Sequence, residues 1–230
     1  MVHPAPIRRN DFYLMYIPPA FRIDDKTRLT AFLRQHSFAT FVTNDGAAPF
    51  ASHLPMLFRP DLGEHGTLIA HLARANPQSQ HFAEGREALA IFHGPHGYIS
   101  PSWYETEPAV PTWNYAVAHA YGIPVVFEDH ERIVSLLRET IALYESGFEQ
   151  PWAGDLPTDY LDKMVRGIVA FEMPIARLEG KFKLGQNRSA ADLQGVYRAL
   201  STSPHADDHA LAQLMVTEGH VPASTLTETP

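Results

Sequence analysis

The sequence predicts a mainly β protein of the α+β class, a closed or split antiparallel β-barrel with peripheral helices and a helical C-terminal segment. Many short segments carry the pattern of strands, few helical segments lie between them, and no strand–helix–strand alternation occurs. Prolines, 19 in 230 residues, add frequent chain reversals. We expect one domain over residues 1–200, followed by a helical extension and polar tail over 201–230.

Seven segments have the composition of strands. The dipeptide Asp45-Gly46, typical of hairpin turns, separates the first two and predicts that they pair as an antiparallel hairpin. Gly122 and Pro124 interrupt the sixth and predict a bend. The expected strands span residues 37–43, 49–58, 67–73, 87–92, 97–100, 113–127 and 167–184.

Helical periodicity marks four longer segments. The first starts with two aspartates that can cap it, and the second carries an apolar stripe that includes Ile133, Leu136 and Ile141. The expected helices span residues 24–36, 128–146, 190–200 and 208–216, with shorter helices after Asn76-Pro77 and before residue 167.

Composition excludes several classes of function. Lys and Arg total 18 against 26 for Asp and Glu, so the net charge of −8 repels polyanions unless basic residues cluster. Cysteine is absent, which excludes disulfides, thiolate metal sites and cysteine nucleophiles. No long apolar run and no apolar signal segment occur, so we expect a cytoplasmic protein with no membrane partner.

The segment from His71 to Pro77 gives the clearest local signal for an anion. Asn76 favours a helix N-cap and Pro77 the first helical position. The helix start would then present unpaired backbone N–H groups beside Arg74 and His71, and a phosphate fits that chemistry. The alternative is an ordinary capped helix with a solvated arginine.

A basic stripe occupies the end of the last expected strand. A strand places alternate residues on one face, and here four basic residues stand against one acidic residue in a chain that is acidic overall. The alternative is a charged strand edge that faces water. The charged and amide side chains of this stretch are Arg177, Glu179, Lys181, Lys183, Gln186, Asn187 and Arg188.

Aromatic side chains gather in two neighbouring blocks, 97–104 and 111–115, where hydroxyl and amide groups lie between them. Such a set can flank a planar conjugated ring while its polar members bond the ring's heteroatoms. Aromatic core packing is the alternative. The side chains concerned are Tyr98, Ser100, Trp103, Tyr104, Thr112, Trp113, Asn114 and Tyr115.

Other chemistries lack a matching pattern. His93 and His96, and likewise His205 and His209, have spacings that could share a metal, but no third ligand follows at a recognisable distance. We therefore expect no metal site. The serine-hydrolase, P-loop and dinucleotide patterns do not occur either.

Six blocks of the chain form a larger pattern, namely Met15–Phe21, Ser52–Pro55, His71–Gln78, Tyr98–Tyr104, Val110–Tyr115, and Arg177–Lys181 with Gln186–Arg188. In order and spacing they resemble the PaiB-type FMN-binding negative transcriptional regulators, over about residues 15–200. The resemblance implies a split β-barrel related to pyridoxamine phosphate oxidase, FMN as cofactor, and a homodimer with the flavin at the subunit interface. Ser79 and Gly185 depart from the family pattern, which often has an aromatic residue and a serine there.

The resemblance also implies which residues contact the flavin. His71, Arg74 and Asn76 match the strand and helix near the flavin phosphate, and the strand that holds Ser52 and His53 would pass the ring. The segment with Lys181, Lys183 and Gln186 could approach from either subunit. The implied contacts are Ser52, His53, His71, Arg74, Asn76, Ser100, Trp103, Thr112, Asn114, Lys181, Lys183 and Gln186.

Three functions remain open. The resemblance implies repression of transcription, but no helix-turn-helix pattern is evident, so a DNA partner would have to contact the basic stripe at 177–188. The second is a flavin-dependent oxidoreductase that uses NAD(P)H or another small electron donor. No acid–base pair stands out, so enzyme activity stays undecided. The third is a protein that binds haem or another planar ligand through His53, His71 or His119.

Overall fold

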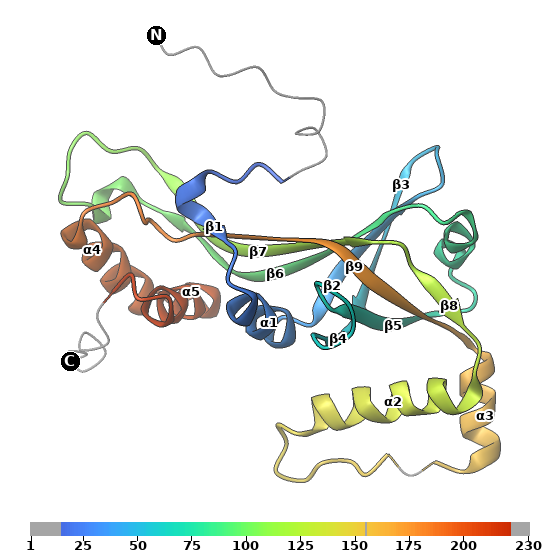
Figure 1. The fold of residues 1–230 in the computed structure, drawn as a ribbon. Coiled ribbons are helices and arrows are strands. Elements are labelled where there is room, and N and C mark those ends of the chain that lie inside the picture. Colours follow the sequence, from blue (N-terminus) through green and yellow to red (C-terminus); the bar gives the residue numbers. More distant parts are fainter. Residues whose placement is uncertain (1–14, 155, 222–230) are drawn as a thin grey trace. The chain divides into compact units, whose positions relative to one another are not determined.

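The computed structural model describes residues 15–154 and 156–221. Within these residues, nine strands form an antiparallel sheet of order β3-β2-β6-β7-β9-β5-β4, and β1 and β8 each pair with β9 (Figure 1). The expected antiparallel, mainly β architecture is confirmed. The strands are β1 (Arg22–Ile23), β2 (Phe38–Asn44), β3 (Pro49–Pro55), β4 (Leu57–Arg59), β5 (Thr67–Ala73), β6 (Ala88–Ile99), β7 (Thr112–Gly122), β8 (Val125–Phe127) and β9 (Ile168–Lys183).

Helices connect and follow these strands. All four longer helices that the sequence predicts are present, as is the short one before β9. No helix in the described ranges has the length and apolar character needed to cross a membrane. The helices are η2 (Pro19–Phe21), α1 (Lys26–Gln35), η3 (Pro77–Glu84), η4 (Pro101–Trp103), α2 (His130–Glu145), α3 (Thr158–Arg166), α4 (Ala190–Ser201) and α5 (Ala206–Thr217).

The chain divides into two compact units, and each consists of several stretches of sequence. Unit 2 comprises Asp25–Gly94 and Val117–Leu178, and unit 1 comprises Pro95–Ala116 with the described parts of Met1–Asp24 and Glu179–Pro230. Strands β6, β7 and β9 therefore contribute residues to both units. The domain boundary expected near residue 200 stays a prediction.

Unit 2 begins with a capped helix and a hairpin. The Asp25 side chain accepts the Arg28 N–H at 3.0 Å, which fixes the start of α1. Strands β2 and β3 pair from Phe38–Pro55 to Asn44–Pro49, around the Asp45-Gly46 turn. The helix and the hairpin predicted from the sequence are both confirmed.

The predicted strand at residues 49–58 needs correction. Residues 49–58 do not form one strand: β3 pairs with β2, and after Met56 the chain continues as β4, which pairs with β5. The Met56 N–H donates to the Ser37 carbonyl at 2.9 Å, and Met56, Leu57 and Phe58 are all buried, so the alternation ends there. The tertiary environment of this bend overrides the strand period.

Residues 87–92 and 97–100 are not two strands but parts of β6, which runs through Gly94 and Pro95. Proline removes a ladder donor and is tolerated only where none is needed. The register of β6 with β2 covers Leu89–Ile91. Pro95 lies past this ladder, so its missing N–H costs no bond to β2.

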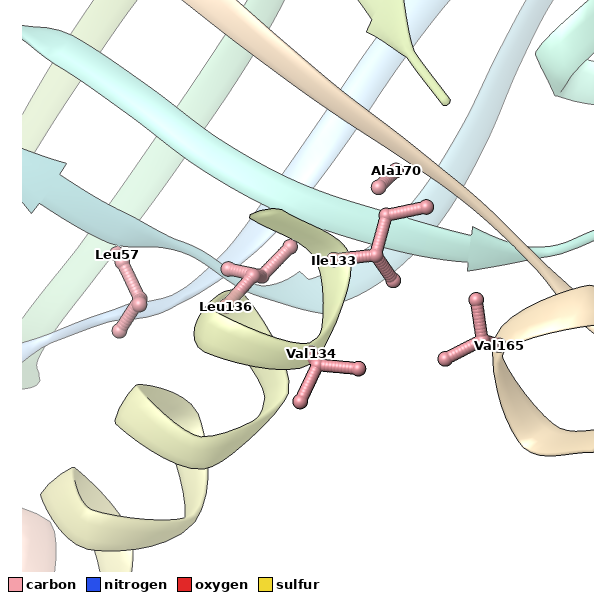
Figure 2. Close-up of a cluster of buried hydrophobic side chains, with 6 residues drawn as sticks. All are labelled: Leu57, Ile133, Val134, Leu136, Val165 and Ala170. Carbon is pink, nitrogen blue, oxygen red and sulfur yellow. The ribbon is translucent and has the colours of Figure 1, made fainter. Parts of the chain in front are cut away.

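Within unit 2, helices α2 and α3 pack against strands β4 and β9 through a hydrophobic cluster (Figure 2). The Asp129 side chain caps α2 by accepting the Arg132 N–H at 2.8 Å. Full burial of each large aliphatic side chain contributes about 1.5–3 kcal/mol, so the cluster stabilises the packing of both helices. Its buried members are Leu57, Ile133, Val134, Leu136, Val165 and Ala170.

Unit 1 contains the end of β9 together with β1, η4, α4 and α5. Strand β1 pairs with β9 through Arg22–Lys181 and Ile23–Gly180. Helix α4 approaches η4 closely at Gly195, where an added Cβ would lie 2.1 Å from the Trp103 carbonyl oxygen. Only glycine therefore allows this contact.

Candidate functional site

The turn after β5 in unit 2 contains the predicted phosphate residues. The Asn76 Oδ1 accepts the Gln78 N–H at 3.0 Å and caps η3, with Pro77 at the first helical position. The Asn76 Nδ2 donates to the Ser52 Oγ at 2.9 Å. The capped helix is thus confirmed, and two predicted site residues from β3 and the turn are in direct contact.

The start of η3 does not present the expected row of unpaired peptide N–H groups. The Gln78 N–H is taken by the cap, the Ser79 N–H donates to the Asn76 carbonyl at 3.3 Å, and Pro77 has none. The Ala75 N–H has no partner within the described ranges. An anion at this turn would therefore be bound by individual donors rather than by a helix terminus.

Arg74 is held in place by backbone carbonyls. Its Nε donates to the Arg166 carbonyl at 2.8 Å and its Nη2 to the Ile168 carbonyl at 2.7 Å. These bonds connect the end of β5 to the start of β9. A guanidinium carries five N–H groups, so its exposed edge keeps donors for a ligand.

The two predicted histidines of unit 2 differ in environment. His71 is half-buried in β5, and burial lowers its pKa, so its ring is neutral near pH 7 and offers one donor and one acceptor. His53 follows Ser52 in β3, and adjacent strand residues point to opposite faces. Because Ser52 bonds Asn76, His53 lies on the other face, where its ring centroid is 6.4 Å from that of Phe38.

Gln78 is a positioning residue that the sequence interpretation missed. Its side chain is fully buried, and its Nε2 donates to the Phe41 carbonyl at 3.0 Å, the Thr43 Oγ1 at 3.1 Å and the Phe50 carbonyl at 3.2 Å. These bonds fasten η3 to the β2–β3 hairpin. The only sequence signal for this role is a polar residue at the second helical position, two residues after the cap Asn76.

Lys181 of unit 1 is buried rather than displayed on a water-facing stripe. Its side chain is 8% exposed, and its Nζ donates to the Tyr16 carbonyl at 2.9 Å. The rings of Tyr16 and Tyr115 lie 5.5 and 5.2 Å from the same nitrogen. A buried ammonium needs such partners, and they come from distant parts of the sequence.

Lys183 lies close to two other cations. Its Nζ donates to the Thr112 Oγ1 and, at 2.6 Å, to the Trp113 carbonyl. Burial lowers its pKa, and repulsion from Lys181 and Arg188 adds to the effect. A bound anion would relieve this repulsion, so the group formed by Lys181, Lys183 and Arg188, here named the lysine group, suits a negatively charged ligand.

Two of the remaining predicted contacts of unit 1, Ser100 and Gln186, have local side-chain bonds. Ser100 caps η4 through its Oγ. Gln186 accepts the Leu184 N–H at 2.8 Å, so its amide oxygen is already bonded within the local turn. Asn114 is 3% exposed, and Trp103 is half-buried.

The predicted residues thus fall into two groups. The turn set in unit 2 contains Ser52, His71, Arg74 and Asn76, with His53 on the opposite face of β3. The group in unit 1 contains Ser100, Trp103, Thr112, Asn114, Lys181, Lys183 and Gln186.

No cluster of three or more metal-binding side chains occurs in residues 15–154 and 156–221.

Residues 15–177 match a family model described as "Putative FMN-binding domain". The "Protease synthase and sporulation protein PAI 2" of Bacillus subtilis is 34% identical over 202 residues, which cover 87% of this chain and 96% of that protein. The family model covers the whole turn set but only part of the group in unit 1, because it ends before the lysine group.

Two solved structures share the fold. The flavocytochrome Anf3 from Azotobacter vinelandii aligns with a TM-score of 0.56 at 14% identity, over 76% of this chain and 72% of that chain. The FAD and heme binding protein from Mycobacterium smegmatis aligns with a TM-score of 0.56 at 16% identity, over 75% and 78%. These likenesses confirm the split-barrel fold class. The chain belongs to the PaiB-type family of FMN-binding split-barrel proteins, and FMN is its cofactor.

Proposed function

We propose that the chain acts as a flavin-binding homodimer that holds the FMN phosphate at the turn containing Arg74 and Asn76. The donor set of this turn is the observation on which the proposal rests. Arg74 keeps guanidinium donors at an exposed edge, and the Ala75 N–H has no protein partner in the described ranges. The Ser52 hydroxyl accepts from Asn76, so its own proton can be donated to a phosphate oxygen.

The charge of the turn suits a phosphate. No acidic residue occurs from His71 to Gln78, so Arg74 is not neutralised by a neighbour in sequence. His71 is neutral near pH 7 and adds a hydrogen bond without adding charge. Hydrogen bonds from a cation to phosphate are roughly twice as strong as those between neutral groups, so Arg74 should dominate the affinity for the phosphate.

The lysine group supplies a second set of cations. Bound FMN would supply transfer of one or two electrons, and Lys183 and Arg188 would favour any negative charge that the ligand carries. Burial lowers the pKa of Lys183, and repulsion from Lys181 and Arg188 lowers it further. We propose that these residues contact the flavin in the homodimer, and the proposal allows either subunit to provide them.

The regulator role is better explained by flavin state than by direct DNA binding. Helix α5 carries two acidic residues in its first turn, Asp207 and Asp208, which repel the DNA backbone. Lys181, which belongs to the expected basic stripe, is buried. We propose that the redox state of FMN carries the regulatory signal. A flavin-dependent oxidoreductase is the second candidate, because FMN itself supplies electron transfer.

The first experiment measures FMN binding and mass. Purified protein should retain FMN after dialysis, show the flavin band near about 450 nm, and have a solution mass twice the 25.7 kDa of one chain. Loss of all added FMN at micromolar protein would refute the proposal.

Two further measurements separate the candidate roles. Bleaching of the flavin band by NADH or NADPH would support the oxidoreductase, and inertness toward both would count against it. A gel-shift assay with promoter fragments at two salt concentrations should show no salt-sensitive binding. A salt-sensitive shift at micromolar protein would overturn the assignment of regulation to flavin state.

A further inference from the structure

A cleft of about 740 Å³ opens in unit 1. Its lining residues come from β6, β7 and η4 and from the end of α4, the start of α5 and the segment between them. Small-molecule sites commonly have volumes of about 300–1,000 Å³. The family model ends at residue 177, before α4 and α5, so this cleft is partly built from residues outside the matched domain.

One wall of the cleft is aromatic. Trp113 is 53% exposed and Tyr98 48% exposed, although both are large rings that usually bury more of their surface. The Trp113 ring stacks on His96 with centroids 6.0 Å apart and meets Tyr98 edge to face at 6.3 Å. Exposed indole and phenol rings held together in this way offer π-faces that attract cations.

The other wall is acidic. Asp207 and Asp208 lie in the first turn of α5 and line the cleft. Asp208 accepts a hydrogen bond from the Ser203 Oγ at 2.5 Å, whereas the side chain of Asp207 is exposed and has no hydrogen bond or ion pair with any described residue. At Gly97 an added Cβ would lie 2.9 Å from the Asp208 Oδ1, so glycine there lets the carboxylate approach β6.

We propose that this cleft binds an organic cation through an alkylammonium group, which packs against Trp113 and Tyr98 and pairs with Asp207. Aromatic faces and a carboxylate together favour an ammonium ion over any neutral or anionic ligand. Lys183 bonds the Trp113 carbonyl but is not among the lining residues. The acidic wall repels the phosphates of a nicotinamide dinucleotide, so the site is distinct from one for an electron donor of that class.

Aromatic cages recognise quaternary ammonium ions in other proteins, so choline is a suitable probe. Its neutral carbon isostere, 3,3-dimethylbutan-1-ol, has the same shape without the charge. Titration calorimetry on the full chain at constant ionic strength should give saturable choline binding with a Kd of roughly 1–10 mM. The isostere should give no saturable heat over the same range.

Two variants test the two walls. Trp113→Leu should weaken choline binding about 2- to 5-fold, which is the change expected on loss of an exposed cation–π contact. Asp207→Asn should weaken choline binding by a similar factor. Asp159→Asn is the matched control, because Asp159 is also an exposed carboxylate in the first turn of a helix, α3 of unit 2. The control should bind choline as the unmodified chain does.

Three outcomes would overturn the proposal. They are an absence of saturable choline binding up to about 50 mM, equal binding of the neutral isostere, and unchanged affinity in both Trp113→Leu and Asp207→Asn. A homodimer that covers the cleft would produce the first outcome. Because the titration needs no flavin, failure of the FMN site would leave choline binding intact, and the two proposals can fail separately.

Discussion

Replacing Arg74 by alanine should weaken the binding of FMN far more than the binding of riboflavin. The carbonyls of Arg166 and Ile168 hold the guanidinium in place before any ligand arrives, so little side-chain entropy is lost on binding. A charge-assisted hydrogen bond contributes about 1.5–3 kcal/mol. The Kd for FMN should therefore rise roughly 10- to 150-fold.

Riboflavin controls for every effect that does not involve the phosphate. The same substitution removes two bonds to backbone carbonyls, each worth about 0.5–1.5 kcal/mol, so the variant will also be less stable. This loss of stability affects the binding of FMN and of riboflavin equally. We therefore expect the Kd for riboflavin to change by less than about 3-fold. Quenching of flavin fluorescence by titrated protein measures both constants.

Arg74→Lys adds a conservative variant. It keeps the positive charge but loses the fork that bonds two carbonyls and a ligand at once. Its FMN affinity should lie between those of the unmodified chain and Arg74→Ala. If Arg74→Ala weakens FMN and riboflavin by the same factor, the guanidinium does not bind the phosphate, and its role is only to connect β5 to β9.

Three other predictions follow from polar groups that are partly or fully buried. Gln78→Ala should lower the free energy of unfolding by about 2–4 kcal/mol in urea titrations, because it leaves carbonyls of the β2–β3 hairpin without donors; a change below about 0.5 kcal/mol would contradict this. Burial lowers the pKa of His71 below its unfolded value, so its contribution is complete above about pH 6.5 and is lost on acidification. His71→Gln should therefore flatten the fall in stability from about pH 7 to 5, and an unchanged slope would contradict this. In NMR titrations of reductively methylated protein, Lys183 should titrate below the other lysines, and Lys181→Met should move it upward; a normal pKa for Lys183 would refute the lysine group.

Local signals in the sequence were sufficient for most of the framework. The cap at Asn76 and the hairpin at Asp45-Gly46 were predictable because each depends on residues a few positions apart. The bend before β8 follows in the same way from Gly122 and Pro124. These features need no knowledge of distant contacts.

The parts that the sequence could not predict depend on distant segments. Lys181 alternates with apolar residues as an exposed side chain would, yet it is buried because the Tyr16 carbonyl and the Tyr115 ring reach it from elsewhere in the chain. Asp192 likewise accepts the N–H groups of Glu105 and Thr106 across more than eighty residues. No local pattern specifies such partners.

Gly195 reverses a common rule of protein stabilisation. Replacing a glycine inside a helix by alanine ordinarily gains about 1 kcal/mol, and programmes of thermal engineering apply that change routinely. In α4 the new methyl group would overlap the Trp103 carbonyl, and η4 would be forced away from the helix. A ranking of substitutions by helix propensity alone would therefore select Gly195→Ala. That substitution would displace η4 and, with it, Trp103 in the wall of the unit 1 cleft.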